Sequence, residues 1–399
     1  GSTRERVRAR GFLLLLGAVI VASPVAAAPF RPTDDTQALE YLPTARDASL
    51  RDLRRLHANL ARTPHDLALA LRVASADIEA ARTHSDPRYN GYAEAALGAW
   101  FMLPSPPPAV LVLRATLRQS RHDFAGALMD LNNAIAADPH NAQAHLTRAV
   151  ILQVEGAYDE ALGNCFSLGL LAAPLVTETC IGSVRSLHGM AAAGRELLQG
   201  ALDRASPTEN EQVRLWALTV LAETDARLGD SPAAERHFRE ALSLGLHDSY
   251  LLGAYADFLL DEGRPQEVRP LLKDETRVDL LLLRLALAEQ SVGAPTLKSH
   301  IADLNERFAA NRRRGDLSHQ REEARFALYL LKDPHEALLL ARANWAQQRE
   351  PWDVRILLEA ALAAETPEAG RPVLAWLATS HLEDEHVRGL AAKLAQSAP

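Results

Sequence analysis

Two stretches of this sequence repeat one pattern at a spacing of 34 residues. The first reads RATLRQSRHDFAGALMDLNNAIAADP over residues 114–139, and the second reads RAVILQVEGAYDEALGNCFSLGLLAAP over residues 148–174. Residues of the same kind recur in phase, and the matched pairs are Arg114 and Arg148, Ala115 and Ala149, Gln119 and Gln153, Phe124 and Tyr158, and Ala127 and Ala161. Each copy has the apolar spacing of two amphipathic helices. A helix–turn–helix period of this length predicts a stack of helix pairs.

The composition agrees with an all-helical chain. Aromatic residues make up 5% of the 399 residues, while Ala and Leu are abundant. Small and unbranched side chains favour closely packed helices, whereas strands are enriched in β-branched and aromatic residues. No stretch shows sustained alternation of apolar and polar residues. We therefore predict an all-α fold.

The repeated pattern resembles that of the tetratricopeptide repeat family. The family's order of small residue, aromatic residue, Ala and closing Pro is matched by Ala115, Phe124, Ala127, Ala134 and Pro139. The resemblance implies a right-handed α–α superhelix of antiparallel helix pairs. It also implies a protein that binds extended peptides or helices along a concave face, lined by the first helix of every repeat.

The residues that the resemblance places on this concave face form our predicted partner-binding groove. They are Gln119, Gln153, Trp216, Glu223, Arg227, Tyr250, Asp257 and Asp261. Glu223 and Asp257 lie one period apart, and so do Trp216 and Tyr250. Aromatic rings beside negative charge would suit a protein or peptide partner with a basic, partly apolar segment. In the alternative interpretation, the aromatic residues pack into the superhelix and the acidic residues are merely solvated.

The N-terminus has the order of segments found in a secretory signal. Four arginines between residues 4 and 10 precede the apolar run 12–22 and the small residues 25–28. This order predicts a signal peptide over residues 1–28, cleaved after Ala27 or Ala28, and hence a periplasmic or secreted protein. In the alternative interpretation, the segment stays as a membrane anchor. Otherwise no transmembrane span is expected.

The remaining chain divides by its helical patterns. Residues 29–46 have turn formers and little periodicity, which predicts an extended leader. Residues 47–104 fit an N-terminal cap helix and a degenerate repeat, and residues 105–275 fit tetratricopeptide-like repeats. Residues 276–399 fit degenerate helical repeats and a C-terminal cap. Because neither terminal helix is strongly polar, a homodimer is possible.

The net charge and the cysteine content limit which classes of partner and which cellular compartment the sequence favours. The formal net charge is −8, and cleavage of residues 1–27 would remove four Arg and one Glu, leaving −11. An acidic surface argues against nucleic acid as the main partner, since phosphate binding needs a basic footprint. Cys165 and Cys180 are the only cysteines, and the repeat phase places them on adjacent helices. We predict a disulfide between them, and the alternative is two buried thiols.

The sequence contains no recognised catalytic or cofactor-binding motif. A Gly-rich phosphate loop, a nucleophile elbow and a zinc-binding His pair are all missing, so no enzyme activity, no cofactor and no metal are expected. His381 and His386 are five residues apart, which would place their rings on different sides of a helix. We therefore predict a non-catalytic scaffold or adaptor of the bacterial cell envelope. Two alternatives stay open: a helical arm of, or accessory to, a cell-wall-processing enzyme, and a periplasmic metal-handling protein.

Overall fold

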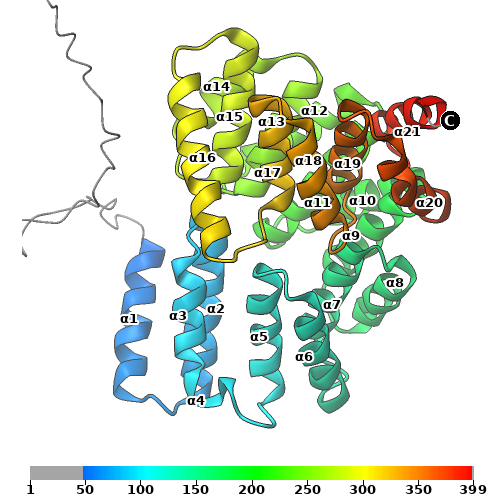
Figure 1. Cartoon of the computed structure of the whole chain (residues 1–399). Coiled ribbons are helices and arrows are strands. Elements are labelled where there is room, and N and C mark those ends of the chain that lie inside the picture. Colours follow the sequence, from blue (N-terminus) through cyan, green and yellow to red (C-terminus); the bar gives the residue numbers. More distant parts are fainter. Residues whose placement is uncertain (1–47, 398–399) are drawn as a thin grey trace, which may run out of the picture. The chain divides into compact units, whose positions relative to one another are not determined.

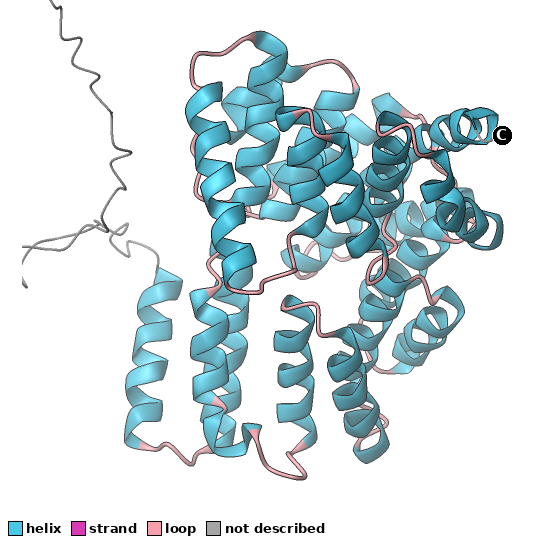
Figure 2. Ribbon diagram, viewed as in Figure 1, coloured by secondary structure: helices cyan, strands magenta, loops and turns pink. Residues whose placement is uncertain are grey.

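The computed structural model describes residues 48–397 of a chain that divides into two units. The first unit, residues 1–48, includes the predicted signal segment and leader, which lie outside the described residues. The second unit, residues 49–399, is built from helices throughout its described part, without a strand (Figure 2). The predicted all-α fold is confirmed.

The two copies of the repeated sequence form two consecutive antiparallel helix pairs, α5–α6 and α7–α8 (Figure 1). The elements up to the middle of the chain are α1 (Ala48–Arg62), α2 (Leu67–His84), α3 (Arg88–Ala96), α4 (Gly98–Phe101), α5 (Pro108–Ser120), α6 (Phe124–Ala137), α7 (Ala142–Glu155), α8 (Tyr158–Ser167), the 3₁₀ turn η1 (Leu168–Leu170), α9 (Pro174–Leu187) and α10 (Ala191–Arg204). Asp123 caps α6 and Asn141 caps α7, each by accepting a backbone N–H bond.

Helix pairing continues through the second half of the chain. Its elements are α11 (Glu211–Arg227), α12 (Ser231–Ser243), α13 (Ser249–Asp261), α14 (Pro265–Leu272), α15 (Asp279–Val292), α16 (Leu297–Arg313), α17 (Gln320–Phe326), the π-helical turn η2 (Ala327–Leu331), α18 (Pro334–Trp345), α19 (Pro351–Ala363), the 3₁₀ turn η3 (Pro367–Gly370), α20 (Arg371–Ser380) and α21 (Glu385–Ser397). Gly229 and Gly263 follow α11 and α13 with φ of 79° and 67°, a conformation that favours glycine after a helix.

Small side chains let the helices of this stack approach closely. Ala115, Ala149, Ala222 and Ala256 are all buried in the core of their pairs. The first helices of successive pairs also contact one another, from α5 through α7, α9, α11 and α13 to α15. They therefore share one side of the stack, which we call the inner face.

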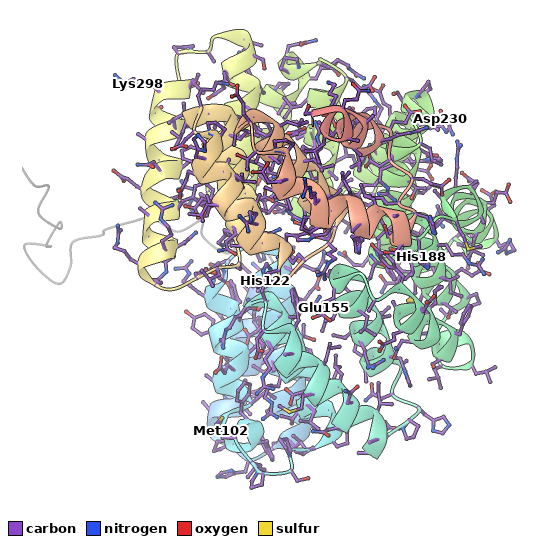
Figure 3. The ribbon with its side chains drawn as sticks, turned by 45° about the vertical axis from the view of Figure 1, so that its right-hand side comes forward. Met102, His122, Glu155, His188, Asp230 and Lys298 are labelled. Atoms are coloured by element: carbon purple, nitrogen blue, oxygen red, sulfur yellow. A yellow bond between two sulfur atoms is a disulfide. The ribbon has the colours of Figure 1, made fainter. Side chains whose placement is uncertain are left out.

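A second structural feature is a row of contacts between the C-terminal part of the chain and the turns inside four helix pairs, α5–α6, α7–α8, α9–α10 and α13–α14. We call this row the turn edge. Its bonds join His122 to Gln348, Val154 to Arg349, His188 to Ser380, Ala191 to Glu383 and Asp261 to Arg355. Figure 3 shows His122, Glu155 and His188 following one another along this border. The C-terminal helices thus pack back onto repeats that lie 94 to 226 residues earlier in the chain.

The turn between α2 and α3 makes a comparable long-range contact. Arg82 pairs with Asp248 at 2.5 Å and donates to Gln212 at 2.7 Å, and the Thr83 carbonyl oxygen lies 2.9 Å from His247 Nδ1. Parts of the stack that are remote in sequence are therefore joined at their turns. Among the described helices, none is both long and apolar enough to cross a bilayer.

Cys165 of α8 and Cys180 of α9 form the predicted disulfide, with Cα atoms 5.5 Å apart. Both residues are buried in a cluster that includes Ala149, Tyr158 and Leu168. The bond therefore links two consecutive helix pairs through their shared core.

We expect Cys165→Ala with Cys180→Ala to lower the free energy of unfolding by about 3 kcal/mol, because a closed loop of this size restricts the unfolded chain. Urea denaturation of the oxidised protein and the double variant measures the difference. Dithiothreitol should lower the wild-type midpoint and leave that of the double variant unchanged. An unchanged wild-type midpoint after complete reduction would contradict the expectation.

Candidate functional site

The inner face brings together four of the predicted groove residues, and side-chain hydrogen bonds there join neighbouring first helices. Ser183 Oγ donates to Gln153 Oε1 at 3.0 Å, Arg227 donates to Ser186 Oγ at 3.0 Å, and Tyr250 Oη donates to Glu223 Oε1 at 2.9 Å. These bonds connect α7 to α9, α9 to α11 and α11 to α13 in turn. Polar side chains therefore join α7, α9, α11 and α13 along the inner face.

Glu223 and Tyr250 form the part of this surface that is open to a partner. Tyr250 is 58% exposed, although a large aromatic side chain usually becomes buried. Burial of the Glu223 carboxyl among the helices raises its pKa to about 7, against the opposing effects of Arg227 and of the Tyr250 hydrogen bond. Arg227, one turn further along α11, donates to Ser186 and Thr224. Near neutral pH, Glu223 thus changes charge beside an exposed ring.

Gln119 and Trp216 contribute less accessible surface. Gln119 is half-buried on α5, and Trp216 is half-buried on α11. Trp216 packs against the cluster that contains the disulfide and Tyr158. For Trp216 the structure therefore agrees with the alternative interpretation, in which the aromatic residue belongs to the superhelix, whereas Tyr250 remains exposed.

Asp257 does not offer a carboxylate to a partner, contrary to the sequence-based expectation. It is 5% exposed, and its oxygens lie 2.7 Å from Arg284 of α15 and 2.7 Å from Arg325 of α17. Burial alone would raise the pKa of Asp257, but the two guanidinium groups outweigh that effect and lower it to about 2. Although Asp257 and Glu223 are one period apart, they have different environments because only Asp257 meets arginines from later helices.

Asp261, at the end of α13, is also neutralised by the chain itself. Arg355 of α19 binds both of its carboxylate oxygens, at 2.7 and 2.8 Å. The Trp352 ring lies between two guanidinium groups, with Arg325 at 3.7 Å and Arg355 at 4.1 Å from its centre. Asp261 therefore fastens α19 to α13.

Sequence reasoning missed the buried arginines Arg284 and Arg325. One signal was available, because Arg284 lies within the largely apolar run 280–290, which has the composition of a buried helix. A charged side chain is rarely buried without a partner of opposite charge. An acidic partner on a neighbouring helix could therefore have been inferred, although not its identity.

Comparison with known proteins gives similarity at the level of fold only. No family model matches the sequence, and no curated protein matches it. Similar solved structures include the APC/C hetero-tetramer Cut9–Hcn1, at 14% identity and a TM-score of 0.48, with 83% of this chain and 63% of the other covered. A tetratricopeptide repeat protein from Parabacteroides merdae is 13% identical with a TM-score of 0.35, and the match covers 78% of this chain and 98% of the other. Yeast Tom70 is 10% identical with a TM-score of 0.24, and the match covers 88% of this chain and 96% of the other.

This chain spans only about 63% of the matched Cut9–Hcn1 chain. The paired helices, their buried alanines and the contacts between successive first helices decide the fold class. The described chain is an all-α solenoid of antiparallel helix pairs.

His381 and His386, the two histidines weighed as a metal site, have structural roles. His386 Nε2 lies 3.7 Å from Asp261, and the backbone of His381 ends α20 in a left-handed conformation. In the part of the chain that the structure describes, no three His, Cys, Asp or Glu side chains are grouped to hold a metal ion. Trp345 is buried and meets Trp376 edge to face.

We expect Asp257→Ala to destabilise the protein by about 3–5 kcal/mol, because it leaves Arg284 and Arg325 buried without their shared carboxylate. Urea denaturation measures the loss. The control is Asp303→Ala, which removes a partly exposed i,i+4 pair with Arg307 and should cost less than about 1 kcal/mol.

The contribution of Asp257 to the free energy of unfolding should decrease at low pH. The carboxyl pKa is about 2 in the folded protein and about 3.9 in an unfolded chain, so the stabilisation is complete above about pH 4 and decreases as the pH falls towards 2. The stability difference between wild type and Asp257→Ala should shrink over that interval. A difference that stays constant would show that Asp257 does not act through its charge.

Proposed function

We propose that this protein is a non-catalytic helical-repeat scaffold of the bacterial cell envelope, which binds a protein or peptide partner through its inner face. The observation that carries the proposal is the exposed Tyr250 ring beside the Glu223 carboxyl. An envelope location follows from the predicted signal segment, and the Cys165–Cys180 disulfide suits an oxidising compartment.

The chemistry of the inner face favours a basic, partly apolar segment of the partner. Tyr250 offers a ring for apolar and cation–π contact, and the Glu223 carboxylate offers an acceptor for Lys or Arg. Asp257 and Asp261 are excluded from this role because arginines of the same chain occupy them. The proposed contact surface is therefore smaller than the predicted groove and is centred on α11 and α13.

We expect Glu223→Lys to abolish retention of a discrete partner from an envelope extract passed over the immobilised mature protein. The substitution would place a cation where the basic segment binds, and like charges in an interface oppose binding. Retention is measured by mass spectrometry of the eluted proteins, followed by titration of the identified partner.

The matched control is Glu240→Lys, which makes the same charge change at an exposed position on the second helix α12. It should retain the partner as well as wild type does. Circular dichroism of both variants establishes that they are folded. Equal retention by Glu223→Lys and wild type would remove the inner face as the binding surface.

Partner affinity should increase between pH 6 and pH 8. Because the pKa of Glu223 is about 7, its carboxyl is mostly neutral at pH 6 and mostly ionised at pH 8, where it can attract a cation. Calorimetric titration at both pH values measures the change. Glu223→Gln should remove most of the increase, so a pH dependence that survives in this variant would assign it to another group.

A further inference from the structure

A hollow at the turn edge lies apart from the Glu223–Tyr250 surface. It has a volume of about 280 Å³ and is formed by the turn 156–160 between α7 and α8, by His188 at the end of α9, and by Trp376, Thr379 and Ser380 of α20. This volume is slightly below the range of drug-sized sites and suits a single side chain or a small ion. Figure 3 shows His188 beside the C-terminal helices that close the hollow.

Three aromatic rings stand together in the lining of the hollow. The centre of the Tyr158 ring lies 5.1 Å from that of His188 and 6.3 Å from that of Trp376. Gly156 has φ of 80°, and a Cβ added there would lie 3.1 Å from the Trp376 indole nitrogen. Gly156 therefore lets Trp376 approach the turn and complete the aromatic lining. Faces of such rings attract cations.

Polar groups in the lining lack partners of their own. Tyr158 and Ser380 are 3% and 4% exposed, and neither hydroxyl oxygen has a hydrogen-bond partner in the described structure. His188 Nδ1 lies 3.1 Å from the Ser380 carbonyl oxygen, and Nε2 lies 3.7 Å from the Asp159 carboxylate. A ligand with N–H donors would satisfy the two hydroxyl oxygens.

Negative charge stands at the mouth of the hollow. The Asp159 side chain is 94% exposed, and the neighbouring Glu160 is held only by Arg148 at 3.5 Å. The nearby cation Arg349 is engaged elsewhere, because it donates to the Glu155 carbonyl oxygen and lies 5.3 Å from the centre of the Trp345 ring. Asp159 is therefore available to an incoming cation.

We propose that this hollow binds an organic cation, an ammonium or guanidinium group on a short aliphatic stem. The Trp376 and His188 rings, backed by the buried Tyr158 ring, contact the stem, and Asp159 pairs with the charge at the mouth. The cation can belong to a free amine or to a Lys or Arg side chain of a polypeptide, since the chemistry of recognition is the same. The proposal does not depend on a partner at Glu223.

The test uses the indole N–H resonance of Trp376 in the full mature chain labelled with ¹⁵N, assigned by its loss in Trp376→Phe. Methylguanidinium, butylammonium, and a short peptide with one arginine between serines are titrated separately. The neutral counterparts are methylurea, butanol, and the same peptide with citrulline. We expect a saturable shift with at least one cationic probe and none with its neutral counterpart. Saturation by the small ions shows that a free cation suffices, whereas saturation only by the peptide identifies a polypeptide side chain.

Asp159→Asn with Glu160→Gln should lower the affinity for the cationic probe by roughly three- to ten-fold, as expected for the loss of two exposed charges. The control, Glu196→Gln with Glu306→Gln, removes two exposed carboxylates from α10 and α16 and should leave the affinity unchanged. The proposal is overturned if no cationic probe shifts the Trp376 resonance. It is equally overturned if the neutral probes bind as well, or if the Asp159 and Glu160 variant binds like wild type.

Discussion

The buried carboxylate of Asp257 determines how the last helices attach to the repeats. It binds Arg284 of the next first helix and Arg325 of the one after that, and Glu322 lies 3.8 and 3.6 Å from the same two guanidinium groups. Arg321 also lies 3.4 Å from Glu322, so three guanidinium groups surround the two carboxylates in this part of the core. Buried ion pairs add little net stability, but an arginine without its partner is strongly unfavourable. The network therefore restricts α13, α15 and α17 to one mutual arrangement.

This arrangement is passed on to α19 by an aromatic ring. The guanidinium groups of Arg325 and Arg355 both lie against the Trp352 ring. Arg355 in turn pairs with Asp261 at the end of α13. One inner helix, α13, is consequently held by α17 through Asp257 and by α19 through Asp261. Once these helices are in place, the segment before α19 reaches the turns of α5–α6 and α7–α8, where Gln348 and Arg349 bind. The turn edge and its hollow depend on this sequence of contacts.

Local sequence was sufficient for the fold class and the helix pairs. The recurrence of Ala115 and Phe124 as Ala149 and Tyr158 reports a periodicity of contacts inside each pair, and these contacts lie within about 34 residues. The environment of Asp257 depends instead on Arg325, 68 residues away, and the hollow depends on Trp376, more than 200 residues from Tyr158. Such contacts follow from small rotations between pairs, summed over many pairs. The repeat pattern fixes which residues face inward, but not which later helix they meet.

The two proposed contact surfaces combine an aromatic ring with a carboxylate, and they should respond differently to salt. The formal net charge of −8 attracts cations at long range, but at physiological ionic strength such attraction is screened beyond about 8 Å. It therefore affects the rate of encounter more than the strength of the final contact. At the inner face the Glu223 carboxyl is surrounded by helices, so salt screens its charge only in part. In the hollow the charge is that of Asp159, whose side chain is 94% exposed at the mouth and fully open to screening. Contact with the inner face should consequently persist at salt concentrations that already weaken attraction to the hollow.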